Sequence, residues 1–226
     1  MTSIYRQALG DDFDRLHPKV QWRFGFSAAD NVCQIGTGVM DDVWRGPWWT
    51  LPFLLVGSTR RVLFPSRGRD VPFTISNYAY VDCFGRETVT WSRRFKLRRR
   101  FRAFDATMVL SRSRGVIIDY LGTHQHLAVD IHCSVDDEGG MCIRSGDQRF
   151  YEGRIAFRFP SLFTGVAEVR EWWDDDTQRF GIEVKVSNPV FGPLFGYRGT
   201  FTVVERPCSR AEIPLDVLPL REEIRE

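Results

Sequence analysis

The chain has 226 residues, of which 43% are hydrophobic, and its formal net charge is +2 at pH 7. This length suits one large all-β domain or two small ones, and the hydrophobic content excludes a disordered chain. The near balance of charge gives no electrostatic reason to expect a nucleic-acid partner. The 18 Phe and 7 Trp residues indicate either a bulky core or a pocket for an apolar ligand.

Targeting and metal-binding signals are not visible. The N-terminus has no basic start followed by an apolar run, and no stretch reaches the roughly 18 apolar residues that a membrane-spanning helix needs. The 5 Cys residues are scattered without a CxxC pair. We therefore expect a cytoplasmic protein with reduced thiols and no metal site.

The chain begins with helical patterns and contains one very apolar run. Apolar stripes predict a helical segment within residues 1–30 that plugs or braces the remainder. Residues 47–57, PWWTLPFLLVG, are too few to span a bilayer. A short buried helix is favoured for this run, ahead of a lid over a cavity and a membrane-surface foot. Trp48 and Trp49, followed by several arginines, would support the foot.

Almost all of the chain after this run alternates as strands. The clearest alternation is RFGIEVKVS, residues 179–187. About nine or ten strands joined in order by short turns predict an antiparallel closed or strongly curved β-barrel over residues 31–204, lipocalin-like in architecture. A barrel of this size commonly holds one small ligand. Residues 205–226 form a charged tail, expected to be loose or a short exposed helix, and residues 1–226 are predicted to be a single domain.

Residues 115–135 hold three of the four histidines. They predict two antiparallel strands joined by a turn at Gly122-Thr123. Side chains in a strand alternate between two faces, so the polar residues should share one face and the apolar residues the other. The predicted polar face consists of His124, His126, Asp130 and His132, and the predicted apolar face of Leu127, Val129, Ile131 and Cys133. Alternation alone leaves open which face points inward.

Several motifs resemble an uncharacterised bacterial domain family, catalogued as a domain of unknown function. The motifs are LGDDFDRLHP near the start, GRDVPF at 68–73, GRETVTWSRRF at 85–95, DYLG at 119–122, GGM at 139–141, REW at 170–172 and RFGIEVKVSNPVFGPLFGYRGTF at 179–201. The likeness covers roughly residues 3–204. Members of that family occur alone or appended to saccharopine-dehydrogenase-like proteins. In that family the positions corresponding to His124, His126 and Asp130 tend to be apolar. The resemblance implies no settled activity.

The titratable residues define a candidate catalytic set. A histidine and a carboxylate on one strand face can share a proton or orient each other. The predicted catalytic residues are His126, Asp130, His132, His124 and Glu168. The predicted ligand-binding residues are Tyr78, Tyr80, Trp91, Tyr120, Arg170, Trp172 and Tyr197. An outward-facing polar stripe is the equally weighted alternative for the histidines, and a metal site at His124, His126 and His132 is a weaker one.

Two functions from different classes follow. The first is a cofactor-independent cyclase or isomerase that acts on a hydrophobic biosynthetic intermediate of terpenoid or polyketide type, since no nucleotide-binding, zincin or nucleophile-elbow motif is present. The second is a non-catalytic barrel that binds a hydrophobic small molecule or lipid. A cavity containing His126 and Asp130 would favour the first, and a wholly apolar cavity the second. A homodimer and a peripheral membrane contact through Trp48 and Trp49 are further expectations. For the basic run at residues 96–100, a solvated turn is favoured over a site for phosphate or nucleic acid.

Overall fold

The computed structural model describes residues 2–98, 100–160 and 164–226. Its helices are α1 (Ile4–Leu9), α2 (Pro18–Gly25) and α3 (Leu51–Thr59), with short 3₁₀ turns η1 (Gly10–Arg15), η2 (Ala28–Asp30), η3 (Trp48–Thr50) and η5 (Arg210–Glu212). Its strands are β1 (Val32–Arg45), β2 (Gly68–Val81), β3 (Glu87–Leu97), β4 (Arg100–Ser111), β5 (Val116–Leu121), β6 (Leu127–Val135), β7 (Met141–Glu152), β8 (Ile155–Arg158), β9 (Val166–Asp174), β10 (Arg179–Asn188) and β11 (Gly192–Pro207).

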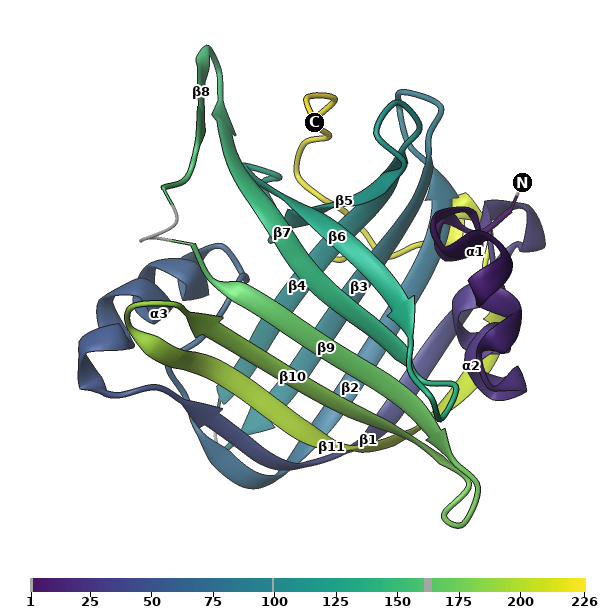
Figure 1. Ribbon diagram of the computed structural model, residues 1–226, viewed down its shortest axis with the longest axis horizontal. Coiled ribbons are helices and arrows are strands. Elements are labelled where there is room, and N and C mark those ends of the chain that lie inside the picture. The colour runs from purple at the N-terminus through teal and green to yellow at the C-terminus, as the bar shows by residue number, and fades with distance from the viewer. Residues whose placement is uncertain (1, 99, 161–163) are drawn as a thin grey trace.

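The strands form a closed antiparallel barrel (Figure 1). Neighbours in sequence pair from β1 to β7, β9 pairs with both β7 and β10, and β11 pairs with both β10 and β1. In the described part of the chain, β8 pairs with β7 alone and extends it as a hairpin outside the ring. Closure leaves the ten ring strands without exposed edges, which confirms the predicted β-barrel.

The N-terminal helices cover one end of the barrel (Figure 1). Pro18 occupies the first turn of α2, where its missing N–H leaves no hydrogen bond unmade. The Ser3 hydroxyl caps α1 and donates to the Phe24 carbonyl. The apolar side chains that these segments bury are Ile4, Tyr5, Phe13, Leu16, Val20 and Phe24. The predicted N-terminal plug is therefore present, and it leaves the opposite end of the barrel as the entrance.

Strand alternation places the core inside the ring. In β10, Phe180, Ile182, Val184 and Val186 are all buried, as the sequence pattern predicts. β1 and β11 approach each other closely where Gly38 of β1 pairs with Phe201 of β11. A Cβ atom at Gly38 would lie 2.0 Å from the Thr200 carbonyl oxygen. The absence of a side chain at this position therefore permits the close approach of the two strands.

The apolar run is helical but not buried. Residues 48–59 form η3 and α3, yet Leu54 is the buried side chain of α3, while Trp48 is 74% exposed and Val56 is 70% exposed. The preferred prediction of a buried helix is therefore wrong on burial. The helix lies at the open end of the barrel, where one side touches the core and the others face outward. None of the described helices has the length and apolar character needed to cross a bilayer.

The C-terminal segment is held against the barrel wall, not loose as the sequence suggested. The Tyr120 hydroxyl donates to the Arg225 carbonyl at 2.9 Å, and the Leu220 amide donates to the Thr123 carbonyl at 2.7 Å. Arg221 donates through Nε to the His124 carbonyl at 2.6 Å. These bonds tie the tail to β5 and to the loop between β5 and β6, and so hold that loop at the entrance.

Candidate functional site

The barrel encloses an apolar cavity of about 510 Å³ that opens at the end opposite the N-terminal helices. This volume lies in the usual range for small-molecule sites. Apolar side chains from β4, β5, β6, β9 and β10 form most of the wall: Phe104, Ala106, Met108, Leu121, Leu127, Val129, Ile131, Val169, Val184 and Val186. At the entrance the lining includes the half-exposed Phe53 and the exposed Val56 of α3. The cavity therefore communicates with the outside beside α3.

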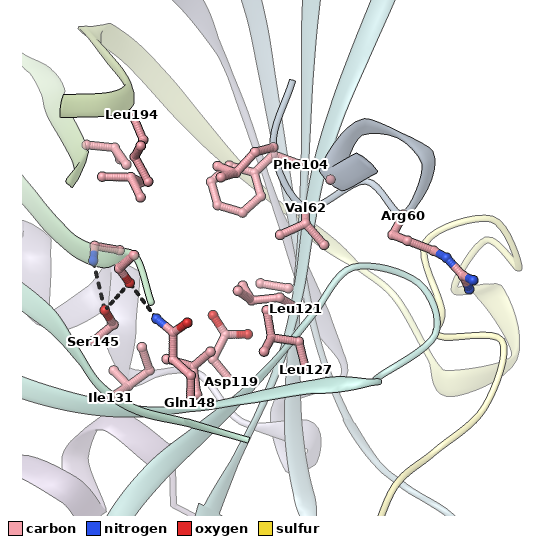
Figure 2. A pocket seen from close by; sticks show the side chains of 18 of the residues that line it. Arg60, Val62, Phe104, Asp119, Leu121, Leu127, Ile131, Ser145, Gln148 and Leu194 are labelled. Carbon is pink, nitrogen blue, oxygen red and sulfur yellow. Dashed lines mark hydrogen bonds between the residues drawn. The ribbon is translucent and has the colours of Figure 1, made fainter. Parts of the chain in front are cut away.

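Asp119 is the carboxyl group on this apolar wall. Figure 2 shows its side chain pointing into the cavity, beside the amide of Gln148. Its Oδ1 atom is buried and has no hydrogen-bond partner among the described residues. Burial raises the pKa of Asp119 from 3.8 to about 7, although the positive charge of Arg93 opposes the rise. Such a carboxyl group can both hold and release a proton near neutral pH.

Arg93 is the cation that faces the same cavity from β3. Its guanidinium stacks 3.7 Å from the centre of the Phe104 ring, and its Nε donates to the Phe104 carbonyl at 3.1 Å. Its Nη1 lies 3.3 Å from the Tyr197 hydroxyl, to which it donates. No carboxylate of the described residues lies within ion-pair distance of Arg93. A buried cation held in this way can attract an oxygen that carries negative charge.

A second charged group lies deeper, toward the plugged end. Arg23 of α2 donates to Glu171 at 2.9 Å, to Gln34 at 2.8 Å and to Asn77 at 2.8 Å. Arg23 and Glu171 are both fully buried, and burial raises the pKa of Glu171 against the charge of Arg23. This network fixes α2 to three strands. We therefore assign it to the attachment of the N-terminal plug.

A β-bulge brings two further polar groups to the wall. Val129 pairs with Gln148, and Ile131 pairs with Ser145, so β7 contains one more residue than β6 over this interval. Both Ser145 and Gln148 consequently line the cavity, although strict alternation would separate residues three apart. Gln148 donates to the Gly165 carbonyl (Figure 2), which fixes its amide group.

His124 and His126 lie at the entrance and line the cavity. They belong to the loop before β6, and their rings are 5.3 Å apart. Strict alternation would point both rings outward with Asp130, but Gln125 between them has a φ of 52°, outside the strand region, and this break lets both rings line the cavity together with Leu127. His126 Nε2 is 2.5 Å from the Glu152 carboxylate. Partial burial and the charge of Arg221 lower the pKa of His126, and Glu152 acts in the opposite direction.

The prediction that all four polar residues share one face is wrong. Asp130 lies on the outer wall between Arg114 and Arg149, at 3.0 Å from Arg114 Nη1. His132 is exposed on that same outer face. The apolar residues of β6 point inward because the interior there is apolar. Glu168 also faces outward and pairs with Arg144 at 3.7 Å, so these three predicted catalytic residues do not meet at the cavity.

The predicted ligand-binding residues divide in the same way. Trp91 lines the cavity, and Tyr197 is buried in the interior as the partner of Arg93. The remaining predicted residues lie on the outer face, where they contact the C-terminal segment or neighbouring strands: Tyr78, Tyr80, Tyr120, Arg170 and Trp172. Their strands alternate in the opposite phase from that assumed.

Sequence reasoning did not place Arg93 or Asp119 in the site. Each occupies a position in phase with apolar core residues: Arg93 lies two residues from Trp91 and from Phe95, and Asp119 lies two residues from Ile117 and from Leu121. A charged residue in the apolar phase of a strand is the signal that could have identified both. Among the described residues, the histidines, cysteines and carboxylates form no group of three suited to a metal ion.

Comparison with known proteins gives a consistent result. The domain of unknown function DUF4166 matches residues 16–201. The chain is also similar to the uncharacterized protein YndH of Bacillus subtilis (strain 168), with 32% identity over 206 residues. That alignment covers 91% of this chain and 99% of the relative.

Proposed function

We propose a function for this chain, which belongs to the family of the domain of unknown function DUF4166: cofactor-independent isomerisation or cyclisation of a hydrophobic small molecule inside the barrel. The observation that carries this proposal is a carboxyl group with a pKa of about 7 on the wall of an otherwise apolar cavity. A cavity that only stored an apolar molecule would not need Asp119. The buried charge would lower stability and give no benefit in binding.

Asp119 would act as the proton donor and acceptor. Because its pKa is about 7, Asp119 at neutral pH is a carboxylate in some of the protein molecules and a carboxylic acid in the others. In an isomerisation, the carboxylate removes a proton from one carbon of the substrate while the double bond shifts. The same group then returns the proton to a second carbon. No oxidant, reductant or co-reactant is consumed, and the carboxylate is regenerated.

Arg93 would stabilise the charge that develops in this reaction. When a proton leaves a carbon next to a carbonyl group, negative charge accumulates on the carbonyl oxygen. Arg93 faces the cavity without a carboxylate partner among the described residues, and its contacts with Phe104 and Tyr197 hold it in place. These features favour a substrate with an apolar body and a carbonyl or similar oxygen. A terpenoid or polyketide intermediate meets this description and suits the cavity volume.

The test compares the wild-type protein with a variant that lacks the Asp119 carboxyl group, both purified from the protein's own host. The Asp119→Asn variant keeps the size of the side chain but cannot accept a proton. We expect this variant to co-purify with an apolar molecule, detected by native mass spectrometry and extraction. Incubation of the extract with wild-type protein in D₂O should give an isomer of changed chromatographic retention that carries deuterium.

The matched control is Asp130→Asn, which changes a carboxylate on the outer wall. The control protein should convert the extract as the wild type does. If wild-type protein binds the extracted molecule but leaves it unchanged, the barrel is a carrier and the enzymatic proposal fails. If no molecule is bound by any of the three proteins, the cavity is not a site for this class of ligand.

A further inference from the structure

Exposed apolar side chains gather around the cavity entrance. Trp48 is 74% exposed, and Val56, Phe101, Val190 and Ile155 are each at least 60% exposed. We call this set the entrance rim. Its members come from η3, α3, the start of β4, the β10–β11 turn and β8, which all lie at the end of the barrel opposite α1 and α2 (Figure 1). Residues distant in sequence thus present apolar surface at one end of the molecule.

The rim is also basic on the side of α3 and the β3–β4 turn. The sequence contains no acidic residue between positions 43 and 69, or between 88 and 104. The exposed arginines of these stretches include Arg60, Arg67, Arg69, Arg98 and Arg100. Among the described residues, none of these five has a carboxylate within ion-pair distance. Figure 2 shows the Arg60 side chain extending away from the cavity.

Tryptophan and arginine together are typical of surfaces that bind membranes. Indole rings prefer the boundary between water and hydrocarbon, and arginines are attracted to anionic lipid headgroups. Apolar side chains inserted beneath the headgroups add affinity in proportion to their buried area. A second copy of the chain is less suitable, because a symmetric contact through this rim would bring unpaired arginines of both copies together.

We propose that the entrance rim is a docking surface for a membrane that contains anionic lipids, with α3 lying in the interface. The docking surface is independent of catalysis, because it rests on the rim alone. If the function proposed above holds, the same geometry places the cavity entrance against the membrane. An apolar substrate could then pass from the bilayer into the barrel beside Phe53 and Val56 without crossing water.

The experiment is flotation of the full chain with lipid vesicles. Vesicles of phosphatidylcholine alone are compared with vesicles in which phosphatidylglycerol is mixed with it in equal amounts. We expect binding to the mixed vesicles that weakens as salt is added, because headgroup attraction is screened. The double variant Trp48→Ser/Val56→Ser should bind at least about tenfold more weakly, since it removes two inserted apolar side chains.

The matched control is Val81→Ser/Val204→Ser, which removes two exposed apolar side chains from the parts of β2 and β11 nearest the N-terminal helices, away from the rim. It should bind the mixed vesicles as the wild type does, and circular dichroism checks that both double variants are folded. The proposal is overturned if wild-type protein does not float with the mixed vesicles, or if both double variants lose binding equally. It is also overturned if size-exclusion chromatography shows a dimer that only the Trp48→Ser/Val56→Ser variant loses. Isomerase activity on dissolved extract is a separate readout, so the two proposals can fail independently.

Discussion

The substitution Asp119→Asn should make the folded protein more stable at alkaline pH. Burial raises the folded-state pKa of Asp119 to about 7 from 3.8. The folded state therefore binds this proton more tightly than the unfolded state does. Stability contributed by this group is greatest below about pH 4, falls as pH rises through about 7, and is constant above that. The asparagine side chain has no proton to lose, so the variant lacks this decline.

The size of the effect follows from the two pKa values. The difference of about 3 pH units corresponds to about 4 kcal/mol at 1.36 kcal/mol per unit. When the pH is raised from about 5 to about 8.5, the ionisation of Asp119 alone should lower the free energy of unfolding of the wild type by about 3 kcal/mol. Because Asp119 is only 8% exposed, screening by bulk solvent reduces this value little, although adjustment of the surrounding protein can reduce it further.

Urea denaturation of both proteins at the two pH values measures the effect. Other titratable groups, including Glu171, whose pKa burial also raises, are present in both proteins and cancel in the comparison. The stability of the variant relative to the wild type should rise by about 3 kcal/mol from pH 5 to pH 8.5. An unchanged difference would show that Asp119 titrates normally, and it would remove the basis for Asp119 as acid and base.

Three further predictions concern the fold. Arg23→Met should lower the free energy of unfolding by about 3–5 kcal/mol, because it leaves Glu171 buried without its cation; the double variant with Glu171→Leu should be more stable than the single one by urea denaturation. Gly38→Ala should cost at least about 2 kcal/mol in thermal unfolding, because its Cβ would overlap the facing backbone. Asp130→Ala should lower the free energy of unfolding by about 1–3 kcal/mol, because it leaves Arg114 and Arg149 without their carboxylate partner. The affinity of the barrel for an apolar fluorescent probe should stay unchanged, and a loss of that affinity would contradict the place of Asp130 on the outer wall.

Much of the barrel was determined by local pattern. The alternation of β10 identifies Phe180 and Ile182 as core residues, because a strand exposes only every second side chain to the interior. Gly85, with a φ of 76°, marks the turn between β2 and β3. Short connections between such segments leave few ways to pair them other than in sequence order. Barrel closure and the N-terminal helices could therefore be predicted.

Which residues form the site depended on which face of each strand points into the closed barrel. Alternation groups side chains by face but does not say which face is inward, and two backbone features break it here: the left-handed Gln125 and the bulge in β7. Asp119 and Arg93 are brought to one cavity by strands that are not adjacent, with β4 between them. Only the closed barrel removes water from Asp119, and burial is what raises its pKa. The sequence by itself determined strands, turns and core phase, whereas the tertiary structure decided which polar residues share the cavity.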